Sequence, residues 1–149
     1  MIKSYEINRN TLAIIPIAKN QSKVIEIDQE FIVEKCPTEI IDDSCKYFGS
    51  SYHGRFEGTK KILGVSYKSP IIVEESREII FFPTASPRYE GCYWISLNNI
   101  EDYLKSNYGT IINFKNGFTL DLNVSLGSFE NQMIRSLRLA NILKRRKLS

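Results

Sequence analysis

The sequence predicts an α+β fold: a single domain with an N-terminal β-meander, a mostly antiparallel sheet, about four helices and a long C-terminal amphipathic helix. Three observations support this prediction. The first third of the chain alternates runs of β-branched residues with turn residues, as consecutive antiparallel strands do. An Asn-Gly pair between two apolar runs indicates a late hairpin, and the C-terminal segment repeats apolar residues at helical spacing. A chain of 149 residues has the size of one domain, so we expect residues 1–149 to form a single one.

The N-terminal meander is expected between Tyr5 and Glu34. Its first strands are Thr11 to Ala18 and Ser22 to Ile27, because both runs are rich in β-branched residues and a Lys-Asn-Gln turn separates them. Pro16 cannot donate a backbone hydrogen bond, so its side of the strand should face a sheet edge.

A first helix is predicted to begin at Pro37, since proline is favoured at the first helical position and acidic residues follow it near the positive end of the helix dipole. Gly49 should end this helix. Its buried stripe is expected to comprise Ile40, Ile41, Ser44, Cys45 and Phe48.

A second helix is expected between Ser50 and Gly64. Its buried stripe should contain Tyr52, Phe56, Thr59 and Leu63, which leaves Arg55 and Lys61 outside. Gly54 and Gly58 each cost about 1 kcal/mol relative to alanine in a helix, so this helix needs packing or a bound partner.

The middle of the chain is predicted to contain a hairpin with strands Ile71 to Val73 and Glu78 to Phe82, ended by Pro83. A surface loop should follow from Thr84 to Gly91, and then a short buried strand from Cys92 to Ile95. Ser96 is expected to cap a third helix that runs through Ile100, Tyr103 and Leu104.

The Asn-Gly hairpin favours a three-residue loop, Lys115 to Gly117, with Gly117 left-handed. This register places Phe114 opposite Phe118 and Ile112 opposite Leu120, whereas a two-residue loop would set polar against apolar residues.

The last and longest helix should run from Leu126 or Ser128 to about Lys147. Residues 144–149 are expected to form a basic, frayed tail. One face should be apolar, with Phe129, Met133, Leu137, Ala140 and Leu143, and the opposite face cationic, with Arg135, Arg138, Arg145 and Arg146.

Positive charge is concentrated in two segments. Residues 44–70 carry five basic side chains against one acidic, and residues 131–149 carry six against none. Interleaved aromatic residues in the first segment suit a polyanion such as nucleic acid, provided that the fold brings the two segments together. A solvated charged surface is the alternative interpretation.

Enzymatic chemistry is not expected. The single histidine, His53, cannot build a histidine metal cluster, and the sequence has no nucleophile elbow, phosphate loop or dinucleotide fingerprint. Three cysteines without CxxC spacing indicate reduced thiols, with Cys45 in the core. No cofactor, metal or membrane span is expected, and we expect a soluble, cytoplasmic protein associated with the nucleoid.

The segment SCKYFGSSYHGRFEGTK, together with later motifs in a fixed order, resembles the competence transcription factor ComK family of Gram-positive bacteria. The likeness covers about Tyr5 to Arg138. The later motifs are Lys68-x-Pro70-Ile71, Phe82-Pro83-Thr84, Cys92-x-Trp94-Ile95-Ser96, Asn116-Gly117 and Ser128-Phe129-Glu130-Asn131-Gln132.

This resemblance implies an activator of DNA-uptake genes that binds A·T-rich DNA boxes mainly through the minor groove. It also implies a homodimer or a dimer of dimers on DNA, and control by a protease adaptor. Trp94 and Phe129 are assigned to the core. The expected DNA contacts are Lys46, Tyr52, Arg55, Lys60, Lys61, Lys68, Arg135 and Arg138.

The resemblance also raises an alternative. Members of the family continue beyond the helix of the SFENQ motif, whereas this sequence ends at Ser149. The alternative is a protein–protein module: a short, tail-less relative that lacks activation or forms mixed oligomers with a full-length relative. In that case the apolar stripe from Phe129 to Leu143 should be exposed in the monomer.

Overall fold

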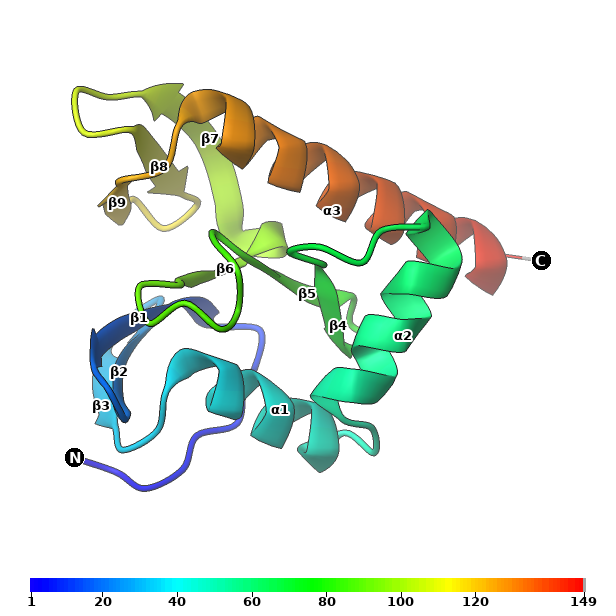
Figure 1. The fold of residues 1–149 in the computed structure, drawn as a ribbon, viewed down its shortest axis with the longest axis horizontal. Coiled ribbons are helices and arrows are strands. Elements are labelled where there is room, and N and C mark those ends of the chain that lie inside the picture. The colour runs from blue at the N-terminus through cyan, green and yellow to red at the C-terminus, as the bar shows by residue number, and fades with distance from the viewer. Residues whose placement is uncertain (149) are drawn as a thin grey trace.

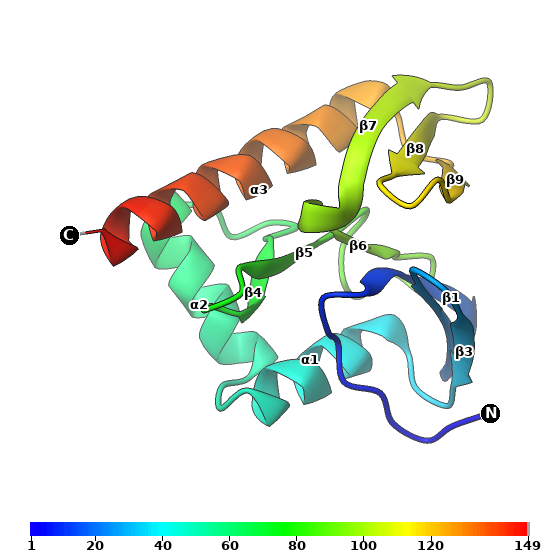
Figure 2. The same ribbon diagram turned by 180° about the vertical axis from the view of Figure 1, so that it is seen from behind.

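A computed structural model describes residues 1–148 of the chain. It is an α+β fold, as predicted, with two antiparallel sheets (Figures 1 and 2). The larger sheet has the order β3-β2-β1-β6-β5-β4 and the smaller one the order β7-β8-β9. The strands are β1 (Thr11–Ala18), β2 (Gln21–Glu26), β3 (Glu30–Val33), β4 (Ile71–Glu74), β5 (Ile79–Pro83), β6 (Trp94–Ser96), β7 (Ile100–Lys105), β8 (Thr110–Phe114) and β9 (Thr119–Leu122).

Residues 1–148 contain three α-helices rather than about four: α1 (Pro37–Tyr47), α2 (Tyr52–Leu63) and α3 (Leu126–Lys147). The start and end signals of α1 were predicted correctly, because Pro37 is its first residue and Gly49 follows it with a φ of +87°. The last helix begins where Ser125 Oγ accepts the backbone N–H of Ser128 at 3.2 Å, which satisfies one free donor of the first turn.

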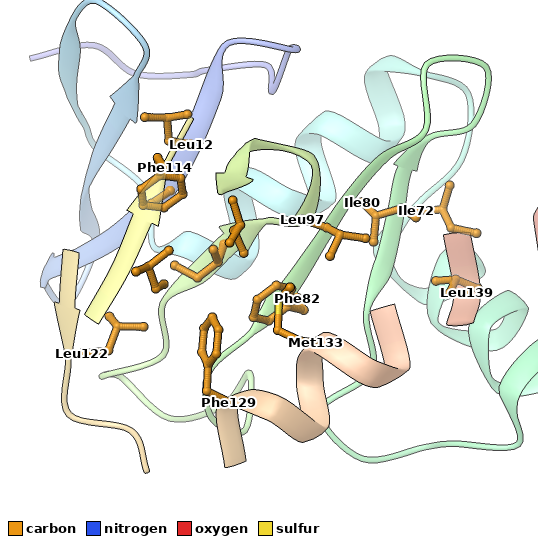
Figure 3. Close-up of a cluster of buried hydrophobic side chains, with 14 of the residues drawn as sticks. Leu12, Ile72, Ile80, Phe82, Leu97, Phe114, Leu122, Phe129, Met133 and Leu139 are labelled. Carbon is orange, nitrogen blue, oxygen red and sulfur yellow. The ribbon is translucent and has the colours of Figure 1, made fainter. Parts of the chain in front are cut away.

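The larger sheet is covered on both faces. One face packs Phe81 and Trp94 against Ile40 and Ile41 of α1. The other face packs against α3 and the smaller sheet, where the ring centroids of Phe82 and Phe129 lie 5.6 Å apart (Figure 3). Trp94 and Phe129 are therefore core residues, as predicted.

The second helix spans the edge of the large sheet next to β4, from the end of α1 to α3 (Figure 1). Thr59 and Leu63 are buried, and Tyr52 and Phe56 are half-buried against the α1 side of the core. This is the predicted stripe. Ser51 begins the helix by accepting the Gly54 N–H at 2.9 Å, and Gly64 ends it with a φ of +73°.

The predicted helix after Ser96 is wrong. Residues Leu97–Asn99 form a single 3-10 turn, and Ile100–Lys105 is strand β7. The register between β7 and β8 shifts between Ile100 and Asp102, so one extra residue is inserted there. As a result Ile100 and Tyr103 both pack against the core although they are three residues apart, a spacing that is also typical of a helix.

The predicted face of α3 is partly wrong. Phe129, Met133 and Leu143 are buried, but Leu137 is 53% exposed and Leu139 is buried instead. Two polar residues, Gln132 and Ser136, lie in the buried face. Helix α3 is therefore rotated about its axis so that Gln132 and Ser136 face the core and Leu137 faces outward.

The late hairpin has the predicted register. Ile112 pairs with Leu120, and the Phe114 N–H donates to the Phe118 carbonyl at 2.8 Å across a three-residue loop. Gly117 has a φ of +94°, which favours glycine over any other residue.

Strand β1 has two neighbours over only part of its length. It lies between β2 and β6, but β6 pairs only with Ala13 and Ile14. Pro16 lies beyond this pairing, so the proline occupies a stretch of the strand that β6 leaves open, as its missing N–H requires.

Candidate nucleic-acid interface

The C-terminal end of α2 presents two lysines next to α3. Lys60 and Lys61 lie in the last turn of the helix and are exposed. Cations are favoured here because the last carbonyl groups of a helix carry partial negative charge. Glu57 lies three and four residues before them on the same helix, but among residues 1–148 no ion pair joins it to either lysine, and no acidic residue occurs between positions 58 and 73.

The loop after α2 is fixed to α3 by two hydrogen bonds from side chains to backbone. Gln132 Nε2 donates to the Lys68 carbonyl at 2.8 Å, and Arg135 Nη1 donates to the Tyr67 carbonyl at 3.0 Å. Lys68 has a φ of +50°, a left-handed conformation that is uncommon for residues other than glycine. The contacts from α3 hold the loop in this strained shape.

Gln132 organises this junction although it was not among the predicted site residues. Its side chain is buried, and Nε2 also donates to the Pro83 carbonyl at 2.7 Å. One amide therefore joins α3, the end of β5 and the loop that carries Lys68. The only signal in the sequence is a polar residue within the apolar stripe of the SFENQ motif.

The two positive segments meet at this junction. The first segment contributes Lys60, Lys61 and Lys68, and the second contributes Arg135, whose side chain contacts the Tyr67 carbonyl. The Tyr67 side chain, also missed as a site residue, is 63% exposed, and Lys68 Nζ lies 5.4 Å from its ring centroid. We call Lys60, Lys61, Tyr67, Lys68 and Arg135 the junction surface.

Two predicted contacts lie elsewhere. Lys46 is on α1, which covers the opposite face of the large sheet from α3 (Figure 2), and its Nζ lies 3.0 Å from Asp42 Oδ2. The Tyr52 ring packs with Phe56 and, edge to face, with Trp94, each at a centroid distance of 6.2 Å. Burial accordingly raises the pKa of the Tyr52 hydroxyl.

Arg55 lines a hollow of about 480 Å³ together with Glu74, Glu75 and Lys147. It lies more than a quarter turn around α2 from Lys60 and Lys61. Its Nε is buried without a hydrogen-bond partner among residues 1–148. Arg55 is therefore beside acidic residues rather than on the junction surface.

Residues 144–147, predicted to be part of a frayed tail, belong to α3. Lys147 Nζ donates to the Glu75 carbonyl at 2.8 Å and fixes the end of the helix to the β4–β5 turn. Ser149, the last residue of the predicted tail, lies outside the described residues.

Arg138 lies on the outward face of α3 and is exposed.

The alternative of an exposed stripe from Phe129 to Leu143 does not match the structure, because Phe129, Met133 and Leu143 are buried within the fold.

The described residues hold no group of three or more metal-ligating side chains. Burial raises the pKa of the Cys45 thiol to about 12 and that of Cys92 to about 11, so neither is a thiolate near neutral pH. The prediction of a core thiol at Cys45 is confirmed. Within residues 1–148, no helix has the length and apolarity that crossing a bilayer requires.

The fold and the junction surface define an α+β protein with a concentrated basic surface. Residues 2–147 match the family model described as ComK protein, so the chain belongs to the ComK family. A curated relative, the competence transcription factor of Bacillus subtilis (strain 168), is 41% identical over 139 residues, which cover 91% of this chain and 72% of the relative. No solved structure matches the chain.

Proposed function

We propose that this protein is a DNA-binding regulator of competence genes and acts as a transcriptional activator. Its target is A·T-rich DNA, bound mainly through the minor groove, and subunits pair on the DNA. Membership of the ComK family and the relative's description as a competence transcription factor support the regulatory role.

One observation carries the DNA-binding part of the proposal: α3 holds the loop of Lys68 by the contacts of Gln132 and Arg135, so parts of the two positive segments lie side by side. Lysine and arginine neutralise phosphates and release the counterions condensed on DNA. Cationic side chains are also attracted into the narrow minor groove of A·T-rich DNA, where the negative potential is enhanced. Lys60 and Lys61 suit the first role, and Lys68 beside the exposed ring of Tyr67 suits the second.

Gly58, which has no side chain, fits a DNA-binding role of α2. A side chain at Gly58 would meet no other atom within 4 Å, so nothing in the fold requires glycine there. A helix face without a side chain at this position lets a duplex backbone come close to Lys61, which lies three residues further along the same face.

Titration of the protein with A·T-rich and G·C-rich duplexes at two salt concentrations tests the proposal. We expect tighter binding to the A·T-rich duplex and a steep loss of affinity with salt. Equal affinity for both duplexes would remove sequence preference, and a flat salt response would remove DNA binding.

A matched pair of variants locates the surface. Lys61→Ala should weaken binding and reduce the slope of log affinity against log salt by about 1, as the loss of one phosphate contact does. Lys46→Ala, which also removes an exposed lysine from the last turn of a helix, should leave the slope unchanged. If the two variants behave alike, the junction surface is not the binding face.

Arg55→Ala tests the expected contact that the structure separates from the junction surface. Because Arg55 lies beside Glu74 and Glu75 and away from the junction surface, we expect this variant to change the DNA affinity little. A loss as large as that of Lys61→Ala would extend the interface around α2.

A further inference from the structure

The outward face of α3 carries two large apolar side chains that the fold does not cover. Ile134 is 62% and Leu137 is 53% exposed, and they lie on adjacent rows of the helix surface. In Figures 1 and 2 this helix runs along one side of the molecule, and no other element lies over its outward side. Single exposed apolar residues are ordinary, whereas these two are neighbours on one uncovered helix face and are flanked by charged residues.

Opposite charges flank Ile134 symmetrically. Glu130 lies four residues before it and Arg138 four residues after it, so all three form one row along the helix. The charged pair is eight residues apart, about 12 Å along the axis, which is too far for them to meet within one chain. Within residues 1–148 neither side chain has a hydrogen bond or an ion pair, and both are exposed.

We propose that the outward face of α3 binds the same face of a second copy of this chain, antiparallel, with a two-fold axis beside Ile134. The symmetry brings Glu130 of each subunit next to Arg138 of the other, so one contact forms twice. On each helix, Glu130, Ile134 and Arg138 form one ridge, and Leu137 belongs to the ridge beside it. In the dimer, the first ridge of one subunit lies in the groove between these two ridges of the other subunit. The pattern of charges is thus complementary to itself only in the antiparallel orientation.

The composition of the face favours a second copy over DNA as its occupant. A duplex would leave Glu130 facing phosphates and would gain nothing from Ile134 and Leu137. The pairing also leaves Lys60, Lys61 and Lys68 outside the contact. A single pair of helices makes a small interface, so we expect a transient dimer with a Kd on the order of micromolar.

The inference deepens the pairing of subunits in the proposed function, but its test uses no DNA, so the two can fail separately. Sedimentation equilibrium should detect a dimer of the unmodified protein. Glu130→Arg and Arg138→Glu should each weaken it at least tenfold, because like charges then meet twice. Circular dichroism confirms that these exposed substitutions leave the fold intact.

Two combinations make the test specific. The double variant Glu130→Arg/Arg138→Glu should form dimers again, and an equimolar mixture of the two single variants should form heterodimers, because both restore opposite charges at each contact. A dimer that is indifferent to these reversals, or no restoration in either combination, would overturn the proposal.

A cross-linking pair tests the position of the axis. Ile134→Cys should give a disulfide-linked dimer under mild oxidation, because the two residues meet beside the axis. Asn141→Cys, which is exposed on the same helix but seven residues away, should remain at the background level of the unmodified protein. Equal cross-linking of the two variants, or a monomeric unmodified protein at about 100 micromolar, contradicts the proposed interface.

Discussion

Helices α1 and α2 follow one another in the chain but are built in opposite ways. Five residues of α1 are buried, against two of α2. Two of the three acids of α1 are paired, Asp42 with Lys46 and Asp43 with Lys35, whereas the two lysines at the end of α2 are in no ion pair among residues 1–148. Helix α1 therefore buries more of its surface than α2, while α2 contains two glycines that weaken a helix and two lysines that no carboxylate pairs with among residues 1–148.

The largest effect is expected from the buried face of α1. Ile41→Ala should lower the free energy of unfolding by about 2 to 5 kcal/mol, because Ile41 is fully buried and its loss leaves a cavity. Ile62→Ala on α2 should cost distinctly less, since Ile62 is only half-buried. Urea unfolding of both variants measures the difference, and equal costs would remove the contrast between the helices.

The junction between α2 and α3 gives the next largest effect. Gln132→Leu should cost about 1 to 3 kcal/mol, because the carbonyls of Lys68 and Pro83 lose their donor. It should also weaken DNA binding by releasing the loop of Lys68, which titration of A·T-rich duplex measures.

Ser136→Ala is the matched control for Gln132→Leu. The Ser136 hydroxyl is buried in the same helix without a hydrogen-bond partner among residues 1–148. Its removal should be neutral or stabilising and should leave DNA affinity unchanged. If Gln132→Leu behaves in the same way, the amide does not hold the junction.

A smaller effect of opposite sign is expected in α2. Gly58→Ala should raise the free energy of unfolding by roughly 0.5 to 1 kcal/mol, because alanine is the better helix former and meets no neighbouring atom. If the bare helix face admits DNA, the same variant should bind DNA more weakly. Thermal unfolding and duplex titration together check this, and a gain in both stability and affinity would contradict the role of the glycine.

The smallest effect is expected for the change of stability with pH that Asp42 causes. Burial raises the pKa of Asp42, but the Tyr52 N–H and the Lys46 ammonium lower it more, so the folded value lies below the ordinary 3.8. The stability from this carboxylate is therefore present above pH 3.8 and is lost as the pH falls through the lower folded value. Asp42→Asn should be less stable than the unmodified protein at pH 6, and the difference should shrink by pH 2.5. A difference that is constant with pH would mean that the charge of Asp42 is irrelevant.

Local chemistry made much of the fold predictable. Turn residues and side-chain alternation were sufficient to predict the meander and the hairpin around Gly117, because the strand register there depends only on nearby residues. Strand β7 was missed because its extra residue puts Ile100 and Tyr103 on one face at a spacing that helices also produce.

The candidate site was harder to predict. The two positive segments could be identified by counting charges, but their meeting depends on Gln132 and on the strained backbone of Lys68, which no periodic pattern reveals. The rule that apolar residues face inward also misplaced Leu137, because Gln132 and Ser136 occupy the buried arc of α3. Buried polar residues are therefore the points at which sequence reasoning fails on α3.

The partial pairing of β1 affects how the protein behaves at high concentration. An open strand edge can recruit strands from other molecules and so start aggregation. Because Pro16 offers no donor on the stretch that β6 leaves unpaired, a foreign strand would find an interrupted ladder there. The proline therefore protects solubility on the stretch of β1 that follows its pairing with β6.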